Sequence, residues 1–226
     1  MTIRVSDIAA AATALQAVLA ALLSSAGPGK TAAGADLRRQ IGALSAGAEG
    51  AIKTADLGAA LLGCFEAAVV AGATLATLRP VLSIITGQSP ATPAAVLVQQ
   101  ACLRMILVAM ARCYAAVPLQ SRADVDAYVT EANDIFGAAE DAASGAAVGA
   151  DVYRALVALH AAVALDLQTR GQPLPRMVSF KFAARRPSLW IANRLYGDGS
   201  REEELRLENA PVHPLFMPDS GRALAQ

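Results

Sequence analysis

The pattern of apolar and polar positions predicts long helices through most of the chain. Apolar residues recur every three to four positions up to residue 170, and polar or helix-breaking residues separate the runs. Thr92 followed by Pro93 is a good helix start, and Ser121 with Asp124 resembles a capping box. Five or six helices are predicted, over about 7–26, 35–53 (the weaker, glycine-interrupted one), 55–79, 93–116, 122–144 and 150–170, with Ser6, Thr54 and Thr92 as N-caps and Pro80 ending the third.

After residue 175 the pattern changes. Residues 177–182 alternate and predict a strand. Ser188 is a candidate cap for a helix over 189–196, with Gly197 as its C-terminal glycine. Ser200 and Glu203 form an S-x-x-E capping box for a helix to about 209, and a loop over 211–218 leads to a return strand at 222–224. The prediction is a mainly α fold: an alanine-rich helical domain of five to six helices (1–170), a Pro-rich linker (171–175) and a small βααβ module (176–226).

Composition sharpens this division. The chain has 226 residues, and 47 of its 53 alanines lie in residues 1–170. The remaining 56 residues hold five of the ten aromatic residues and six of the 11 prolines. Alanine favours helices but buries little area, so its helices need close packing. We therefore expect either tight packing of these helices or completion of the core by neighbouring subunits, and a homo-oligomer rather than a solitary monomer.

Charge and cysteine usage exclude several classes. Nineteen basic residues balance 19 acidic residues, which argues against an electrostatically driven nucleic-acid binder. The three cysteines, Cys64, Cys102 and Cys113, lack CxxC spacing and lie in apolar runs. They are interpreted as buried thiols rather than as a disulfide framework or a zinc site.

A membrane or signal segment is an alternative for the apolar helices. The run over 8–26 carries no charge and is long enough to span a bilayer, and Arg4 precedes it. Asp7, however, stands at its start, and Glu66 and Arg104 interrupt the later apolar runs. Polar groups inside a span are costly, so core helices are the favoured interpretation.

No residue constellation indicates catalysis. Residues 27–31 resemble the end of a P-loop, but Ser24 stands where the first glycine is needed and a helix leads in. His160 lies in an apolar helix, where a core or subunit-contact role is expected, and His213 lies between prolines. No third metal ligand or nucleophile accompanies them. We expect no catalytic residues, cofactor or metal, and no enzyme.

The C-terminal residues resemble a known family. Residues 188–197 (SLWIANRLYG), 204–209 (ELRLEN) and a proline-bearing turn are similar to a LysM-type module, although the turn at 218–221 departs from the compact Pro-Gly form. More specifically, residues 186–198, the acidic helix and residues 212–218 (VHPLFMP) resemble the C-terminal end of the DNA circularisation (DNA circulation) proteins of Mu-like phages. About 50 residues carry the match, while the helical region matches in character only. Family members usually begin with a further β-rich domain, whereas the first 170 residues of this sequence are expected to be helical.

The resemblance implies a non-enzymatic structural protein of a contractile phage tail. It would act as a baseplate hub or tape-measure-proximal adaptor, with other tail proteins as partners, in the virion and, during assembly, in the host cytoplasm. Three alternatives stay open: a peptidoglycan-binding LysM module, a DNA-end-binding protein and a membrane helical bundle. Nucleic-acid and membrane partners are not expected.

The candidate partner-binding residues all lie in the C-terminal module. They are Arg185, Arg186, Trp190, Tyr196, His213 and Phe216. For Trp190 and Tyr196 the competing interpretation is the core of the module, since a unit of about 50 residues needs its aromatic side chains for burial. Phe216 and His213 are less easily explained by core packing, because loops on rigid scaffolds often carry contacts.

Overall fold

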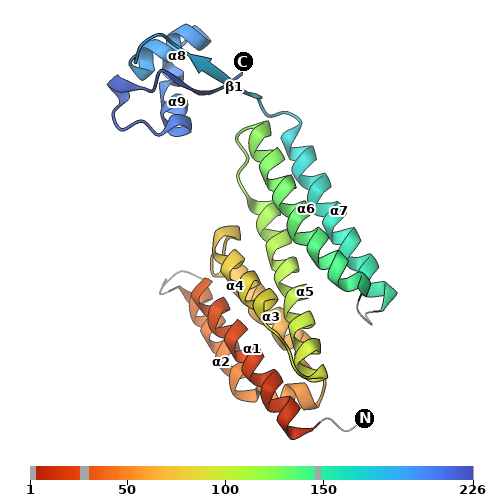
Figure 1. The fold of residues 1–226 in the computed structure, drawn as a ribbon. Coiled ribbons are helices and arrows are strands. Elements are labelled where there is room, and N and C mark those ends of the chain that lie inside the picture. Colours follow the sequence, from red (N-terminus) through yellow and green to blue (C-terminus); the bar gives the residue numbers. More distant parts are fainter. Residues whose placement is uncertain (1–3, 26–30, 146–148, 226) are drawn as a thin grey trace. The chain divides into compact units, whose positions relative to one another are not determined.

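The computed structural model describes residues 4–25, 31–145 and 149–225, and they form a mainly α-helical protein with one small sheet (Figure 1). This confirms the predicted fold class. The described α-helices and strands are, in chain order, α1 (Val5–Ser25), α2 (Ala32–Lys53), α3 (Leu57–Val70), α4 (Leu75–Gly87), α5 (Pro93–Ala116), α6 (Arg122–Gly145), α7 (Ala150–Gly171), β1 (Met177–Lys181), α8 (Ser188–Tyr196), α9 (Glu202–Asn209) and β2 (Ser220–Leu224). Two 3-10 turns, η1 (Gly199–Arg201) and η2 (Pro214–Phe216), complete the C-terminal region.

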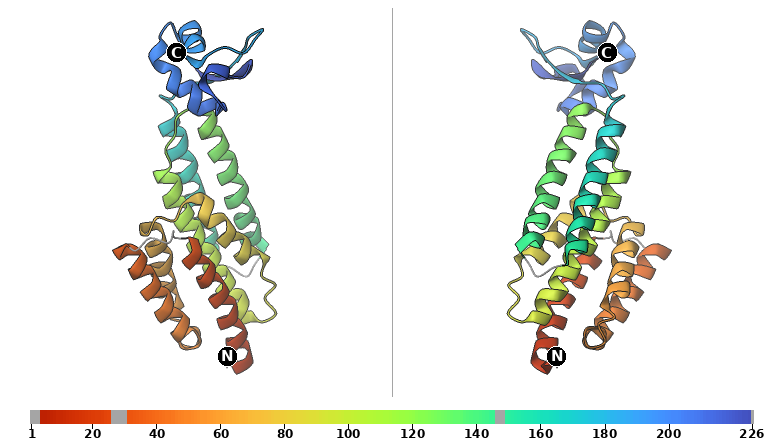
Figure 2. Two further views of the ribbon diagram at one scale, coloured as in Figure 1. Left: turned by 90° about the vertical axis from the view of Figure 1, so that its left-hand side faces the viewer. Right: turned by 90° about the vertical axis from the view of Figure 1, so that its right-hand side faces the viewer.

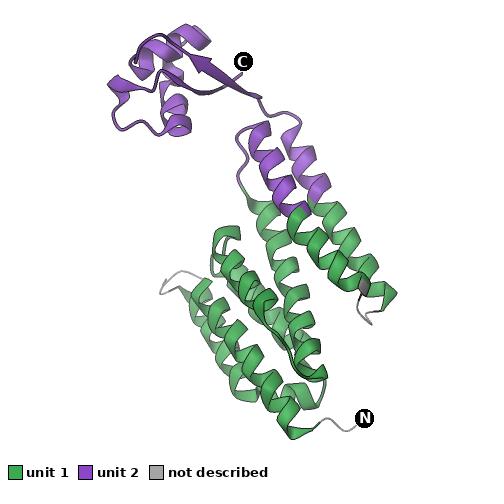
Figure 3. Ribbon diagram, in the orientation of Figure 1, with its two compact units in different colours: residues 1–117, 134–163 green, residues 118–133, 164–226 purple. Residues whose placement is uncertain are grey.

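The chain divides into two compact units (Figure 3). Unit 1 comprises residues 1–117 and 134–163, and unit 2 comprises residues 118–133 and 164–226, so α6 and α7 contribute to both. This division differs from the predicted boundary at residue 171. One physical reason is Arg122, whose side chain donates to the carbonyl oxygens of Gln172 (2.9 Å) and Leu174 (3.0 Å) and whose backbone N–H donates to that of Pro175 (3.0 Å). The predicted linker is thereby tied to the start of α6.

Unit 1 is built around α1 and α5. Helix α1 packs against α2, α4 and α5, and α3 packs against α2 and α5 (Figures 1 and 2). The buried face of α1 repeats with helical period, at Ile8, Ala11, Ala12, Leu15, Val18, Leu19 and Leu22. Helices α1 and α5 are long and apolar enough to cross a membrane by length and composition alone, a test that core helices of globular proteins also pass.

Several predicted helix ends are confirmed. The Thr92 side chain caps α5 with Pro93 in its first turn. Ser121 and Asp124 exchange the two hydrogen bonds of a capping box, at 2.9 and 3.2 Å. Gly197 follows α8 in the left-handed conformation, with φ +70°.

The prediction of one long helix over residues 55–79 is wrong. The helix is broken between Val70 and Leu75, where Gly72 adopts φ +97° and Thr74 forms a capping box that starts α4. Pro80 does not end a helix but lies inside α4. The described part of the chain therefore has seven helices up to residue 171, not five or six.

Other predicted caps also differ. Helix α1 already begins at Val5, so Ser6 lies inside it, and Thr54 follows α2 as its C-cap. Ser188 is the first residue of α8, after Pro187 as N-cap, and its buried hydroxyl donates to Glu202 instead. In place of the predicted Ser200 capping box, Asp198 accepts from the Ser200 backbone N–H at 2.8 Å and caps η1. The glycines at 27 and 29 lie outside the described residues.

The C-terminal part of unit 2 has the predicted βααβ order. Strands β1 and β2 pair antiparallel from Met177 with Leu224 to Lys181 with Ser220. Helices α8 and α9 pack together, and α9 packs on β2. The core of this module consists of Phe180, Ile191, Ala192, Tyr196, Leu205, Met217 and Ala223, with Phe182 and Leu195 at its edge. Burial of these side chains is the main stabilising contribution to the module.

Candidate functional site

Two loops of unit 2 lie against each other and form the candidate site. The first connects β1 to α8 (residues 182–187), and the second connects α9 to β2 (residues 210–219) and contains η2. The backbone N–H of Phe182 donates to the carbonyl of Asp219 at 2.6 Å, and that of Met217 donates to the carbonyl of Arg186 at 3.1 Å. We call the side chains that these loops and α8 present the two-loop surface: Phe182, Arg186, Trp190, Leu215 and Phe216.

Trp190 is the centre of one half of this surface. Its side chain is 43% exposed. The ring of Phe182 meets it edge-on, with centroids 5.3 Å apart, and the Arg186 guanidinium lies 5.2 Å from the Trp190 ring centroid. This cation–π contact and the ring contact hold an exposed aromatic side chain in one orientation. A fixed, exposed tryptophan loses little conformational entropy when a partner covers it.

The second half of the surface lies on η2. Leu215 and Phe216 are exposed, Phe216 by 64%. His213 caps this turn, because its Nδ1 accepts from the Leu215 backbone N–H at 3.1 Å, and its ring lies 5.9 Å from that of Phe216. His213 thus fixes the loop that presents the two apolar side chains. Its Nδ1 is engaged in this cap, which favours a positioning role over a contact role for that nitrogen.

Tyr196 lies in the core of the module and is only 8% exposed, which is the competing interpretation that the sequence left open. Its hydroxyl donates to Glu204 at 3.0 Å, and the Arg201 guanidinium lies 3.8 Å from its ring centroid. Burial, followed by the hydrogen bond to Glu204, raises the pKa of Tyr196 to about 12. This tyrosine is not part of the two-loop surface.

Charge is unevenly distributed in unit 2. Between residues 172 and 197 the chain carries five basic side chains and no acidic one: Arg176, Lys181, Arg185, Arg186 and Arg194. None of the five forms an ion pair within the described part of the chain. The arginines that follow are paired: Arg201 with Glu204 (2.8 Å), Arg206 with Glu203 (2.7 Å) and Arg222 with Glu208 (2.8 Å). The segment that contains β1 and α8 is therefore basic and carries its positive charges without acidic partners.

Two of these cations flank Trp190 on α8. Arg186, in the loop before α8, lies against the Trp190 ring. Arg194 lies four positions after Trp190 on α8, and residues four apart on a helix share one face. Arg185 is exposed beside them. An aromatic ring between guanidinium groups suits a partner that offers carboxylates and an apolar side chain together.

The described residues offer few groups for chemistry. They contain no cluster of three or more His, Cys, Asp or Glu that could hold a metal ion. The three cysteines are buried, and burial raises the pKa of Cys64 to about 11 and that of Cys102 to about 12. His160, in unit 1, stacks on Phe136, and its Nδ1 lies 2.9 Å from a Glu140 carboxylate oxygen; its side chain is partly buried.

Sequence reasoning found four of the residues around the two-loop surface and missed two. Arg186, Trp190, His213 and Phe216 lie on or directly beneath it, whereas Phe182 and Leu215 were not predicted to bind. Their sequence signal was present, since Phe182 ends the alternating strand pattern and Leu215 lies beside Phe216. Only the backbone hydrogen bonds between the two loops bring the segments that carry them together.

The structure thus defines a mainly α-helical protein with a C-terminal βααβ module that carries an exposed aromatic and basic surface. Neither the models of known protein families nor the curated proteins compared with this chain match it. The resemblance to the phage DNA circularisation proteins therefore rests on the quoted C-terminal residues.

Proposed function

We propose that this protein is a non-enzymatic structural adaptor of a contractile phage tail, located at the baseplate near the tape measure. The observation that carries the proposal is the two-loop surface, where Trp190 and Phe216 are held exposed by specific contacts. Large aromatic side chains and arginine dominate the binding energy of protein interfaces. The family resemblance of the same residues supplies the phage context.

The chemistry of the surface indicates what kind of tail neighbour it fits. The partner surface would carry carboxylates for Arg186 and Arg194 and an apolar side chain that covers Trp190. The alanine-rich outer faces of unit 1 support a second role in assembly. Exposed alanines on α1, such as Ala9, Ala17 and Ala20, allow another helix to approach closely.

The proposal is tested by complementation of a phage that lacks this gene. The wild-type chain, a Trp190→Ala/Phe216→Ala double variant and a Leu207→Ala control are supplied in trans, and particles are labelled on the protein for electron microscopy. Leu207 is an exposed apolar residue of α9, outside the two-loop surface, so its loss controls for general stickiness. We expect label at the baseplate for wild type and control, and at least a roughly tenfold loss of incorporation for the double variant. Label absent from the tail in the wild type rejects the proposal.

A second candidate function is peptidoglycan binding of the LysM type. The specific observation in its favour is that Trp190 and Phe216 expose aromatic rings, which can cover the apolar faces of sugars. Co-sedimentation with purified sacculi distinguishes the two functions. Retention that the double variant loses favours glycan binding, and sedimentation equal to that of a chain lacking the module rejects it.

A further inference from the structure

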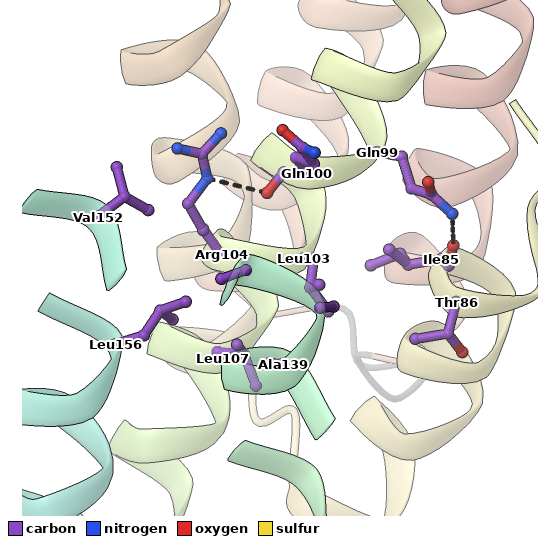
Figure 4. Close-up of a pocket in the computed structure, with 12 residues that line it drawn as sticks. Ile85, Thr86, Gln99, Gln100, Leu103, Arg104, Leu107, Ala139, Val152 and Leu156 are labelled. Carbon is purple, nitrogen blue, oxygen red and sulfur yellow. Dashed lines mark hydrogen bonds between the residues drawn. The ribbon is translucent and has the colours of Figure 1, made fainter. Parts of the chain in front are cut away.

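Unit 1 contains an apolar cavity of about 300 Å³ that the adaptor function does not use (Figure 4). Helices α4, α5, α6 and α7 contribute its walls, through residues that all belong to unit 1. The lining is Ile85, Thr86, Gln99, Gln100, Leu103, Arg104, Leu107, Ala139, Ala142, Ala143, Val152 and Leu156. Eight of these twelve side chains are apolar, as in typical small-molecule sites, and the volume lies at the lower end of their range.

The polar groups of the cavity differ in their hydrogen bonding. The Gln99 amide donates to the carbonyl oxygens of Ile85 (2.8 Å) and Gln88 (3.0 Å), which fixes it to the end of α4. Arg104 uses only its Nε, which donates to the backbone carbonyl of Gln100 at 3.0 Å. Its two terminal nitrogens and the side-chain amide of Gln100 have no hydrogen-bond partner within the described ranges 4–25, 31–145 and 149–225.

Figure 4 shows Arg104 and Gln100 side by side in the upper part of the view, with Val152 and Leu156 next to Arg104 on the left. A partly buried guanidinium beside apolar walls and without a carboxylate has lost hydration that nothing in the described chain replaces. An anion at this point restores the lost interactions through charge-assisted hydrogen bonds. Gln100 adds an amide donor to the same end, so the polar end of a ligand meets donors from two adjacent side chains.

The size of the cavity limits the rest of the ligand. An apolar cavity of about 150 Å³ holds one benzene ring, so about 300 Å³ accommodates roughly a dozen heavy atoms. Leu103, Leu107 and Leu156 offer an apolar wall for such a chain. We propose that unit 1 binds a small amphipathic monocarboxylate, such as a medium-chain fatty acid, with its carboxylate on Arg104 and Gln100 and its alkyl chain along these leucines.

Calorimetric titration of the full chain with decanoate, below its micelle-forming concentration, tests the site. We expect saturable binding at one decanoate per chain. Decanol, which has the same chain length without the charge, should bind at least about tenfold more weakly, because it cannot form the ion pair. Absence of saturable decanoate binding, or equal binding of decanol, overturns the proposal.

Three variants locate the bound molecule. Arg104→Met keeps an apolar stem and should weaken decanoate binding about tenfold or more, whereas Arg104→Lys should retain more of it. Ala139→Leu places a larger side chain in the cavity and should abolish binding. The Trp190→Ala/Phe216→Ala variant removes the exposed aromatic rings of unit 2 and should bind decanoate like the wild type.

Circular dichroism spectra and thermal melts verify that each variant is folded. Equal affinity of Arg104→Met and wild type would show that the guanidinium does not recognise the carboxylate. Binding lost only in the Trp190/Phe216 variant would place decanoate on the two-loop surface instead. Either result refutes the site, without bearing on the adaptor function.

Discussion

Gly221 of β2 is the position where one added methyl group should damage the C-terminal module most. A Cβ at this residue would lie 2.7 Å from Cζ of Phe180 and 3.0 Å from Cγ of Asn209, and closer still to the Asn209 Oδ1 atom. Neither neighbour is free to move. Phe180 lies in the module core. The Asn209 amide donates to the carbonyl oxygens of Leu205 (2.9 Å) and Arg222 (2.8 Å), and its Oδ1 accepts from the Arg222 N–H at 2.8 Å.

The loss in free energy of unfolding expected for Gly221→Ala follows from these contacts. In Gly221→Ala, Asn209 must leave the Arg222 backbone, which loses two hydrogen bonds at about 1 kcal/mol each. Displacing Phe180 in a packed core adds about 1–3 kcal/mol. The lower entropy of the unfolded alanine variant offsets about 0.4–1 kcal/mol. The expected net loss in free energy of unfolding is therefore about 3 kcal/mol.

Urea unfolding followed by tryptophan fluorescence measures this loss, because Trp190 is the single tryptophan of the chain and lies in the module. With an m-value of about 1–2 kcal/mol/M, the fluorescence midpoint should fall by about 1.5–3 M urea. Ser220→Ala, an exposed neighbour on the same strand, is the control and should change the free energy of unfolding by less than about 0.5 kcal/mol.

A double-mutant cycle tests the reasoning further. Asn209→Ala removes the hydrogen bonds and also the atom that obstructs the new methyl group, so the two changes together should cost less than their sum by about 1 kcal/mol or more. A Gly221→Ala midpoint within about 0.2 M of wild type, or strict additivity with Asn209→Ala, would refute the close-approach argument.

Three further predictions concern other parts of the chain. The pKa of Tyr196 is about 12 in the folded state and about 10 when unfolded, so the folded state holds the phenol proton more tightly. The contribution of Tyr196 to the free energy of unfolding should be complete below pH 10 and should fall as pH rises from about 10 to about 12. Tyr196→Phe should flatten this fall in the tryptophan-monitored urea midpoint. Because burial raises the pKa of Cys64 to about 11 and of Cys102 to about 12, a thiol reagent near neutral pH should label these cysteines only after denaturation, and fast labelling of the native chain would contradict their burial. Gly171→Ala would place a Cβ 2.6 Å from Cγ2 of Val125, so it should cost about 1–3 kcal/mol in thermal unfolding, and Val125→Ala should rescue part of that loss.

Local signals in the sequence were sufficient for much of the fold. Thr92–Pro93, Ser121 with Asp124, and Gly197 mark helix ends correctly, because caps depend on backbone groups within a few residues. The alternation at 177–182 likewise indicated the strand that became β1. Between residues 70 and 80 several helix-breaking signals compete, and the predicted helix end is at the wrong one. Gly72 and Thr74 break the third predicted helix, while Pro80 is accommodated in the helix that follows.

The candidate site depends on contacts that no local pattern contains. Trp190 and Tyr196 lie six residues apart on one short helix, and the sequence did not decide which of them faces the core. The packing of α8 on α9 and the sheet places Tyr196 inside, against Glu204 and Arg201, and leaves Trp190 outside with Phe182 and Arg186. Which side chain is buried depends on which surfaces meet in three dimensions. Helical periodicity alone therefore does not decide whether Trp190 or Tyr196 faces the core.

The amino-acid sequence by itself determined the helical character, the alanine-rich composition of the first 170 residues and the small βααβ module, since these follow from propensity, periodicity and capping over short distances. Tertiary structure decided how residues far apart in the chain combine. Arg122 binds the carbonyl oxygens of residues 172 and 174, Met217 meets Arg186, and Arg104 faces a cavity with walls from four helices. Each of these depends on long-range packing, in which small differences in buried area and hydrogen bonding select one arrangement among many that the same local pattern permits.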